Sequence, residues 1–467
     1  MQRWPRWKTK YAWILYMATI GKRSRGRVRD QDRCRKPTIY NLGASTNAGS
    51  QIRRSHGAYY LVHDECRSIT VHGVLEKVSI LGSSAKYDIC TSSSATVSHR
   101  QCSTGNAALG VRLPAGCCHV YTADGRCVSL FKVLLTNRCS NDCFYCQNAT
   151  SCQARGKTAT FTPAELAATF LEYYKRNYVE GLFLSSGITG DPGIMMGDMI
   201  ETARLLREKY QFAGYIHMKV LPGSSLSDVR AIAVHADRIS LNMEAPTKAH
   251  LAEFSSTKDF NSDIMTRLIW MRGVNERQAL SAGMTTQVIV GGNEATDHEI
   301  LTNTCLMYKA FKHKRVYYSA FSPVKGSPLE HVAATPVLRE HRLYQADWLL
   351  RCYHFDKRDV LPPKGTNLPL DIDPKTSLAM RQFHDRFPLE VNEASIDELL
   401  HVPGIGPRSA KRIVALRKKG TRIEKEAHLK ALGVVMKRAL PFIAINGARH
   451  ARLDEWAVLN KLVAHLQ

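Results

Sequence analysis

The sequence predicts an α/β protein in which a partial (β/α)6 TIM-like barrel is followed by a small all-α domain. From about residue 127, short apolar runs alternate six times with helical stretches, a pattern typical of parallel strands joined by helical crossovers. Near residue 389 this pattern gives way to short helices separated by glycine-containing turns. Six units suit a partial barrel rather than the full eight.

The barrel is expected to span residues 127–330. Two of its helices begin with clear capping signals: Thr162 with Glu165, with Pro163 at the first helical position, and Thr296 with Glu299. In such folds, functional residues gather at the carboxyl ends of the strands. The strands are expected at 127–137, 181–187, 215–221, 238–244, 285–290 and 316–321.

The rest of the chain completes the domain plan. Residues 1–72 are expected to form a poorly ordered basic N-terminal extension, and residues 73–126 a segment that precedes the barrel. Residues 331–388 are rich in proline, with one helix near 338–352, and form a connector. The small helical domain is expected at 389–447, with a helical tail at 448–467.

The charge of the protein is concentrated at its two ends. The 467 residues include 65 Lys and Arg against 41 Asp and Glu, a formal net charge of +24. Residues 1–60 carry 14 basic and 2 acidic side chains, and residues 401–467 carry 14 and 4, whereas the remainder is nearly neutral. Basic ends are typical of proteins that bind a polyanion, most often nucleic acid. No apolar run reaches the ~18–20 residues of a membrane span, so we expect no integral membrane protein.

The first twenty residues have roughly the shape of a signal peptide, but no small-residue cleavage site follows them. An organellar transit peptide and upstream sequence translated from an early start remain alternatives. We expect a cytoplasmic protein.

Three of the thirteen cysteines form a CxxxCxxC loop, Cys139, Cys143 and Cys146, at the end of the first barrel strand. A disulfide framework would contain an even number of cysteines spread along the chain. This local cluster therefore indicates a reducing compartment and a metal site. A structural zinc site is the alternative, but zinc usually takes four ligands as two pairs, and no second pair follows. Three thiolates on one loop suit a cubane iron–sulfur cluster with one iron left open.

The loop, with Tyr145 before its last cysteine, resembles that of the radical S-adenosylmethionine (SAM) superfamily. The resemblance implies a [4Fe–4S] cluster held by the three cysteines, whose open iron binds the amino and carboxylate groups of S-adenosylmethionine. Reducing the cluster then cleaves the sulfonium and yields a 5′-deoxyadenosyl radical. It also implies an electron donor such as flavodoxin or ferredoxin.

The same resemblance implies further cofactor contacts. The segment Ser185, Ser186, Gly187 corresponds to the family's Gly-Gly-Glu segment at the methionine amino group, although no acidic residue is present here. Asn242 and Glu244 lie two residues apart on the fourth expected strand, so both side chains should face the same side. They resemble the ribose-binding pair, with an ordinary buried polar pair as the alternative. Gly291, in Val288–Gly292, belongs to a segment similar to the one that lies against the adenine, toward which Tyr145 would present its backbone. No residue is assigned to the chemical step on the substrate.

A second motif, VPGIGPRSAKRI at 402–413, lies between two amphipathic helices, the first opened by a capping box at Ser395 and Glu398. The outward-facing amides of such a glycine hairpin, at a helix N-terminus, bind phosphate well. The motif resembles the helix-hairpin-helix family, which binds the DNA backbone without reading sequence. A weaker second copy of the motif has Gly433 in its turn, followed by Lys437 and Arg438. The alternative to nucleic-acid binding is a hairpin that docks a protein or is purely structural. The predicted nucleic-acid-binding residues are Gly404, Ile405, Gly406, Arg408, Lys411 and Arg412.

Three further segments, at 75–90, 118–127 and 368–375, resemble a bacterial subfamily of DNA modification or repair radical proteins. That subfamily is often linked to a uracil-DNA-glycosylase-like partner. The expected function is therefore modification or repair of DNA by a radical enzyme. An RNA-modifying radical enzyme and a non-catalytic iron–sulfur protein that binds nucleic acid are the alternatives. Cys118, His119 and Cys127 lie in the matched region, where buried thiols and a packed histidine are favoured over a second metal site.

Overall fold

The computed structural model describes residues 50–55, 58–63, 71–85, 116–121, 127–382 and 384–449. Most of the predicted N-terminal extension therefore lies outside the described residues. Within it, β1 (Ser50–Ser55) and β2 (Ala58–His63) pair as an antiparallel hairpin. All but the first two residues of the predicted C-terminal tail also lie outside the described part of the chain.

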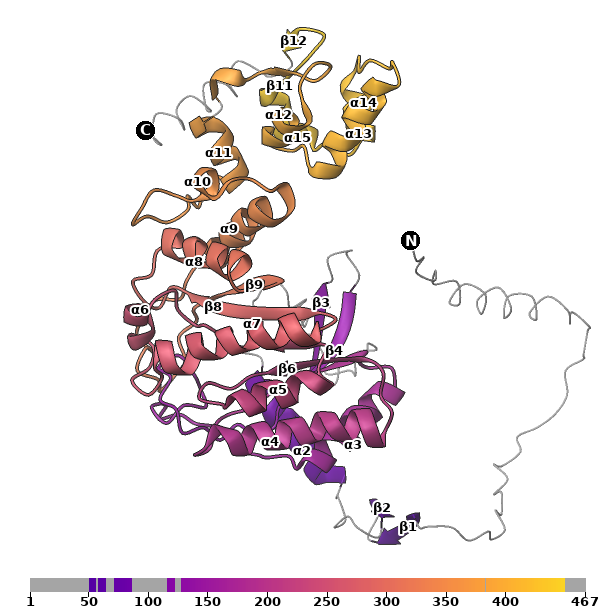
Figure 1. Ribbon diagram of the computed structural model, residues 1–467, viewed down its shortest axis with the longest axis vertical. Coiled ribbons are helices and arrows are strands. Elements are labelled where there is room, and N and C mark those ends of the chain that lie inside the picture. The colour runs from indigo at the N-terminus through magenta and orange to yellow at the C-terminus, as the bar shows by residue number, and fades with distance from the viewer. Residues whose placement is uncertain are drawn as a thin grey trace, which may run out of the picture.

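The main sheet has seven strands in the order β3-β4-β5-β6-β7-β8-β9 and forms a curled half-barrel (Figure 1). The six strands β4 to β9 are parallel and confirm the predicted alternation. An edge strand was not predicted: β3 (Cys117–Tyr121) pairs antiparallel with β4. The six parallel strands are β4 (Cys127–Leu134), β5 (Gly181–Ser185), β6 (Tyr215–Lys219), β7 (Arg238–Ser240), β8 (Gly283–Val290) and β9 (Arg315–Ala320).

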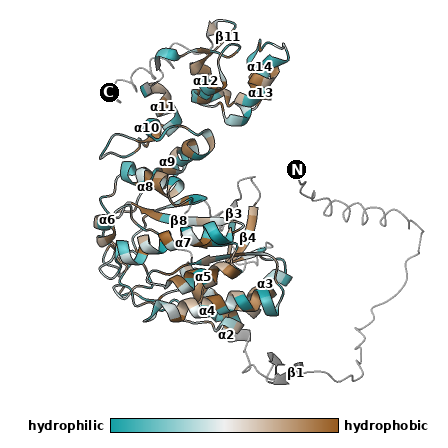
Figure 2. Ribbon diagram, in the orientation of Figure 1, coloured by the Kyte–Doolittle hydropathy of each residue, from teal (hydrophilic) through white to brown (hydrophobic). Residues whose placement is uncertain are grey.

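Helices cover the outer face of this sheet, and in Figure 2 they carry both hydrophobic and hydrophilic positions. Both predicted capping boxes are present, at Thr162 and at Thr296. The apolar sides of the helices pack on strand residues such as Phe131, Leu182 and Ile216, which are fully buried in the main core. The helices are α2 (Val71–Ser84), α3 (Pro163–Lys175), α4 (Pro192–Arg204), α5 (Leu226–His235), α6 (Lys248–Ala252), α7 (Thr266–Gln278) and α8 (Asp297–Lys309), with π-helices η2 (Leu205–Lys209) and η3 (Phe260–Met265).

The connector is more helical than predicted. The expected helix is present as α9 (Val337–Trp348), which continues into the π-helix η4 (Leu349–Tyr353). Two further helices follow, α10 (Lys357–Val360) and α11 (Pro374–Gln382), and then the short 3₁₀ turn η5 (His384–Arg386). In Figure 1 this orange region separates the half-barrel from the yellow C-terminal module.

The C-terminal module is helical, as predicted, and has a hydrophobic core of its own. It also contains a small sheet in the order β10-β11-β12 that sequence did not predict, because its strands are only two or three residues long. Its elements are β10 (Leu389–Glu390), α12 (Ile396–His401), α13 (Pro407–Lys418), α14 (Glu426–Ala431), α15 (Met436–Ala439), η6 (Leu440–Phe442), β11 (Ile443–Ile445) and β12 (Ala448–Arg449). In the described residues, no helix combines the length and the apolar character needed to cross a membrane.

Candidate functional sites

The cysteine loop lies just beyond the carboxyl end of β4 and is held by its neighbours on two sides. The Ser140 amide donates to the Ile188 carbonyl at 2.5 Å, and the Phe144 amide donates to the Phe254 carbonyl at 2.8 Å. Cys143 is buried, whereas Cys139 and Cys146 are half-buried. The three thiols therefore stand where the strand topology places the functional edge of the barrel.

Asp142, inside the loop, fixes it to the segment that follows α6. Its carboxylate accepts hydrogen bonds from the Ser255 hydroxyl at 2.6 Å, the Ser256 amide at 3.0 Å and the Thr257 hydroxyl at 2.8 Å. Partial burial raises the pKa of Asp142, but these bonds outweigh it and hold the pKa well below its usual range. The carboxylate thus stays ionised and ties the loop to residues 255–257.

Lys258 brings a positive charge among the thiols. Its ammonium nitrogen lies 3.8 Å from Glu244 Oε1 and donates to the Tyr145 hydroxyl at 3.3 Å. Burial lowers the pKa of Lys258, but the neighbouring Cys143 and Glu244 outweigh it and raise the pKa. Burial also raises the pKa of Cys143, which Lys258 counteracts and Glu244 reinforces. The site therefore holds one buried cation to offset the negative charges around it.

The cysteine loop offers three thiol donors, at positions 139, 143 and 146. In the described part of the chain, no three His, Cys, Asp or Glu side chains converge as they would on one metal ion. A tetrahedral zinc site would bring its sulfurs to about 2.3 Å from one centre. In a cubane cluster each thiolate binds a different iron, so the three sulfurs stand further apart. The loop of Cys139, Cys143 and Cys146 therefore has the donor set for a [4Fe–4S] cluster.

The predicted segment Ser185–Gly187 contacts the start of the cysteine loop. A Cβ at Gly187 would lie 2.1 Å from the Arg138 carbonyl oxygen, so only glycine allows this close approach. Ser185 is buried at the end of β5. The buried hydroxyl of Ser186 has no hydrogen-bond partner within the described residues, and it is available to a ligand at this edge.

The structure revises the simple alternation predicted for Asn242 and Glu244. β7 ends at Ser240, and Glu244 has φ +65°, a left-handed conformation that is uncommon for a residue with a long side chain. An isolated parallel bridge joins Glu244 to Val288 of β8, and the Glu244 side chain is buried beside Lys258. The backbone turn, rather than an extended strand, therefore aims this carboxylate at the cysteine loop, and Asn242 remains half-buried.

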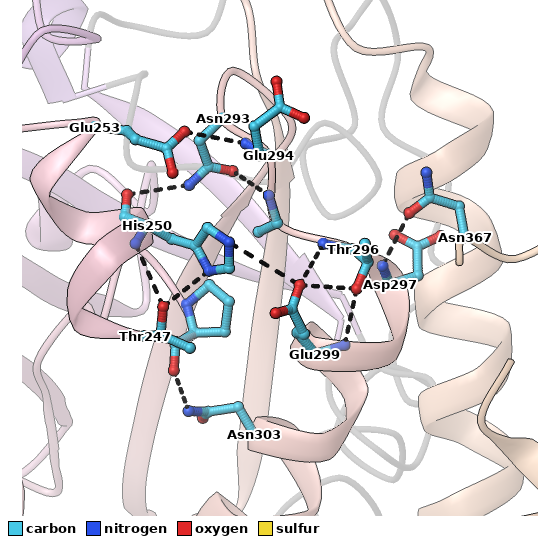
Figure 3. A network of polar contacts seen from close by, with 12 residues as sticks. Thr247, His250, Glu253, Asn293, Glu294, Thr296, Asp297, Glu299, Asn303 and Asn367 are labelled. Carbon is cyan, nitrogen blue, oxygen red and sulfur yellow. Dashed lines mark hydrogen bonds and ion pairs between the residues drawn. The ribbon is translucent and has the colours of Figure 1, made fainter. Parts of the chain in front are cut away.

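The loop after β8 carries Gly291, as predicted, in a conformation that requires glycine. Gly291 has φ +77°, and a Cβ there would lie 2.0 Å from the Thr335 hydroxyl. The same loop is tied to α6, since the Asn293 side chain donates to the His250 carbonyl at 3.2 Å (Figure 3). In the same network the Glu294 amide donates to the Glu253 carboxylate at 3.1 Å. The two loops that follow β7 and β8 are thereby held together.

Neither Asp142 nor Lys258 is marked as a site residue by a motif in the sequence. Asp142 lies inside the cysteine motif, and its hydroxyl-rich partner segment SST at 255–257 is more than a hundred residues away. Lys258 follows that segment directly, but only the fold brings it to the cysteines. No local pattern marks either contact.

Cys118, His119 and Cys127 are not gathered into a metal site within the described residues. They lie on β3 and β4, where His119 Nδ1 is 3.1 Å from the Ser129 hydroxyl. Cys118 is half-buried and Cys127 is exposed. The structure brings none of the three to the cysteine loop at the far end of β4.

The first glycine hairpin lies between α12 and α13. Gly404 has φ +85°, and Gly406 caps α13 without a side-chain hydrogen bond, so the first amides of the helix have no side-chain acceptor at that cap. Ile405 is buried in the core of the module, which assigns it to packing. The side chains of Arg408, Lys411 and Arg412 are exposed on α13. The predicted basic residues therefore surround a helix N-terminus, where backbone amides favour an anion.

The predicted second hairpin is also present, between α14 and α15, with Gly433 at φ +89°. The two hairpins pack against each other: a Cβ at Gly404 would lie 2.5 Å from the Val435 carbonyl, and one at Gly433 would lie 3.2 Å from the Ser409 hydroxyl. The Val435 amide also donates to the Gly404 carbonyl at 2.9 Å. The module is thus a pair of reciprocally packed hairpins.

Lys375 of α11 is buried beneath the first hairpin. Its ammonium donates to the Ile405 carbonyl at 2.5 Å and lies 4.5 Å from the centroid of the Tyr353 ring. Burial lowers the pKa of Lys375 to about 7, and the charge of Arg438 acts in the same direction, while Asp373 opposes it. The contact between α11 and the first hairpin therefore contains an amine whose pKa is about 7.

We expect Lys375 to make the stability of the module rise with pH above neutrality. Between pH 7 and about 10.4 the unfolded chain keeps this amine protonated while the folded module does not, so unfolding binds a proton. The free energy of unfolding should rise by up to about 1.4 kcal/mol per pH unit in this window. In Lys375→Met the slope should be absent, as measured by urea unfolding followed by circular dichroism at pH 6.5, 8 and 9.5. If the free energy of unfolding changes with pH in the same way in the wild type and in Lys375→Met, the pKa of the buried amine is not lowered.

Comparison with known families agrees with this geometry. Residues 133–303 match the model of the Radical SAM superfamily, and residues 388–440 match that of the helix-hairpin-helix motif. The chain therefore carries a Radical SAM superfamily domain followed by a helix-hairpin-helix motif. Enzymes of this superfamily use a [4Fe–4S] cluster and S-adenosylmethionine.

Several solved structures are similar to this chain. HydG, a maturase of the [FeFe]-hydrogenase, is 10% identical at a TM-score of 0.37, over 45% of this chain and 46% of its own. Methylornithine synthase (PylB) is 14% identical at a TM-score of 0.36, over 45% and 59%. The radical S-adenosylmethionine methyltransferase TsrM from Kitasatospora setae is 10% identical at a TM-score of 0.34, over 55% and 47%. The chain spans about half the length of these proteins. Among curated proteins none matches at a significant level.

Proposed function

We propose that this protein is a radical SAM enzyme that modifies or repairs nucleic acid, with DNA as the first candidate. The observation that carries the proposal is the presence, in one chain, of the cysteine loop and of an exposed basic hairpin pair. The bound cluster and S-adenosylmethionine would supply a 5′-deoxyadenosyl radical, and the hairpins would hold the polymer by its backbone. A flavodoxin or ferredoxin would serve as the electron donor, and the reaction would take place in the cytoplasm. The resemblance at residues 75–90 and 118–127 suggests a uracil-DNA-glycosylase-like partner.

In this proposal the residues around the cysteine loop have separate tasks. Cys139, Cys143 and Cys146 hold the cluster, and Asp142 fixes their loop through residues 255–257. The segment Ser185–Gly187 lies beside the loop, where the free hydroxyl of Ser186 can accept from the methionine amino group. Glu244 and Asn242 would bind the ribose, and the Gly291 loop and Tyr145 backbone would flank the adenine.

Reduced protein supplied with S-adenosylmethionine and duplex DNA should release 5′-deoxyadenosine, measured by liquid chromatography with mass spectrometry. Nucleosides prepared from the DNA and RNA of a deletion strain should then differ from the wild type in DNA. A change confined to RNA would favour the RNA-modifying enzyme, because phosphate contacts do not distinguish the two sugars. Absence of 5′-deoxyadenosine even with nucleic acid present would favour a non-catalytic binder.

The change Glu244→Ala should weaken the binding of S-adenosylmethionine and leave the iron content unchanged. The carboxylate is assigned to ribose hydroxyls, and losing one charge-assisted hydrogen bond costs about 1.5–3 kcal/mol. Isothermal titration of the reconstituted protein measures the dissociation constant, with Glu208→Ala, an exposed carboxylate on η2, as the matched control. An unchanged dissociation constant would assign Glu244 to its ion pair with Lys258 alone.

A further inference from the structure

Lys258 lies among the residues of the cysteine loop, but the proposed function gives it no task. It belongs to the segment that follows α6 and contacts the cysteine loop. Its own position on this segment is fixed from both sides. The Lys258 amide donates to the Ser255 hydroxyl at 3.3 Å, and the next residue, Asp259, caps η3 by accepting from the Ser262 amide at 2.7 Å. The backbone therefore holds the lysine in a defined place beside the thiols.

Three groups surround the ammonium of Lys258, which has three N–H donors. It donates to the Tyr145 hydroxyl at 3.3 Å, lies 3.8 Å from Glu244 Oε1, and lies beside the Cys143 thiol. The side chains of Lys258 and Glu244 are only 9% and 10% exposed, so solvent and salt screen their charges little. A buried ion pair adds little stability by itself, and charged groups held in this way are typical of functional sites.

The charge of Lys258 acts on all three thiols of the loop. Burial, the largest cause, raises the pKa of Cys143 and of Cys146, and Lys258 lowers both. Cys139 acts in turn on Lys258, whose pKa it raises. At Cys143 the effect of Lys258 is larger than the opposing effect of Glu244. The buried pair of Lys258 and Glu244 therefore favours negative charge at the Cys143 sulfur.

We propose that Lys258 raises the reduction potential of the cluster held by the three cysteines. Reduction of a [4Fe–4S] cluster from the 2+ to the 1+ state adds one electron and no proton, so the negative charge of the cluster and its thiolates grows by one. A fixed cation beside a ligating sulfur stabilises this more negative state, since net charge and hydrogen bonds near the sulfurs set such potentials. Lys258 acts through Cys143 as a positioning residue, and it makes electron transfer from a flavodoxin or ferredoxin more favourable. The inference rests on the cluster of the proposed function and not on its nucleic-acid target.

The test measures the reduction potential of the anaerobically reconstituted full-length protein in the absence of S-adenosylmethionine. Electrochemical titration is followed by electron paramagnetic resonance of the reduced cluster. Lys258→Met should shift the equilibrium toward the oxidised cluster roughly tenfold or more, and a factor of ten lowers the potential by about 59 mV for one electron. Lys248→Met, on α6, is the matched control, because its side chain is 69% exposed and its charge is screened. An unchanged potential in Lys258→Met would overturn the inference.

Lys258→Met leaves the carboxylate of Glu244 buried without its cation, which is destabilising, so further variants keep the test independent of that protein. Glu244→Gln removes the opposing charge and should raise the potential. The double change Lys258→Met, Glu244→Gln removes the whole pair, and its potential should lie below that of Glu244→Gln by the same factor of roughly ten or more. Lys258→Arg keeps the charge and should keep the wild-type potential. Equal potentials in the double variant and in Glu244→Gln would contradict the assignment.

The outcomes distinguish this inference from the proposed function. Unchanged potentials in proteins that still bind duplex DNA and release 5′-deoxyadenosine would refute the inference alone. If the potential of Lys258→Met is unchanged but its affinity for S-adenosylmethionine falls, Lys258 belongs to cofactor binding instead, and the inference is wrong. The expected shifts in proteins that neither bind duplex DNA nor release 5′-deoxyadenosine would refute the proposed function alone.

Discussion

Replacing any one of Cys139, Cys143 or Cys146 by alanine should abolish the absorbance near roughly 400 nm that an anaerobically reconstituted iron–sulfur protein shows. In the proposed ligand set each thiolate binds one iron, and residues 139–146 contain no fourth cysteine to replace a lost one. Iron content should fall with the absorbance, and 5′-deoxyadenosine formation should be lost. Of the three thiols, only that of Cys143 is fully buried, and it lies beside Lys258.

Two other cysteines are the matched controls. Cys117 lies on the edge strand β3, and Cys305 is buried in α8, so neither belongs to the cysteine loop. Alanine at either position should leave the absorbance intact, with only the stability loss expected of a buried thiol. Equal loss at Cys117 would mean that the ligand set is wrong and that β3 contributes to it.

The double change Arg408→Ala, Lys411→Ala should weaken duplex binding strongly and make it less dependent on salt. Each lost phosphate contact should shallow the slope of log affinity against log salt by about 0.9, so the pair should shallow it by about 1.8. Because backbone contacts carry no sequence information, unrelated duplexes should be affected alike. Fluorescence anisotropy over a salt series measures both effects, and cleavage of S-adenosylmethionine should be unaffected.

Two control variants test whether the location of the removed basic residues, rather than the amount of charge removed, determines the loss of duplex binding. Lys418→Ala, Lys419→Ala removes the same charge from the exposed far end of α13 and should leave the slope nearly unchanged. Deleting residues 1–60 removes a net charge six times larger, but that stretch has no glycine hairpin in its sequence. We expect this deletion to change affinity less than the double change. The reverse order would place nucleic-acid binding in the N-terminal segment and leave the hairpins as a docking element for a protein.

The parts of the protein that sequence predicted are those set by local chemistry. The capping boxes at Thr162 and Thr296, the apolar strands, and the glycine turn at Gly404 each carry a signal within a few residues. The antiparallel edge strand β3 and the three short strands of the C-terminal module were missed, because they lie outside the repeated alternation of apolar runs and helices that predicted the barrel strands.

The site was predicted less completely for a related reason. The CxxxCxxC spacing marks the loop, but Lys258 and Asp142 depend on contacts between segments more than a hundred residues apart. The left-handed backbone at Glu244 was not foreseen either, since alternation along a strand assumes a regular extended chain. Local patterns in the sequence indicated the candidate site residues, whereas tertiary contacts determine how these residues are oriented toward one another.

The reciprocal contact of Gly404 with Val435 and of Gly433 with Ser409 has a genetic consequence. An added methyl at either glycine would displace the backbone or side chain of the other hairpin, so one substitution should disturb both hairpins. A second glycine substitution would then add little further damage. The two positions should therefore behave as a single mutational target. By contrast, exposed Arg408 and Lys437 can vary separately, so each hairpin could adapt its affinity while the glycine pair stays fixed.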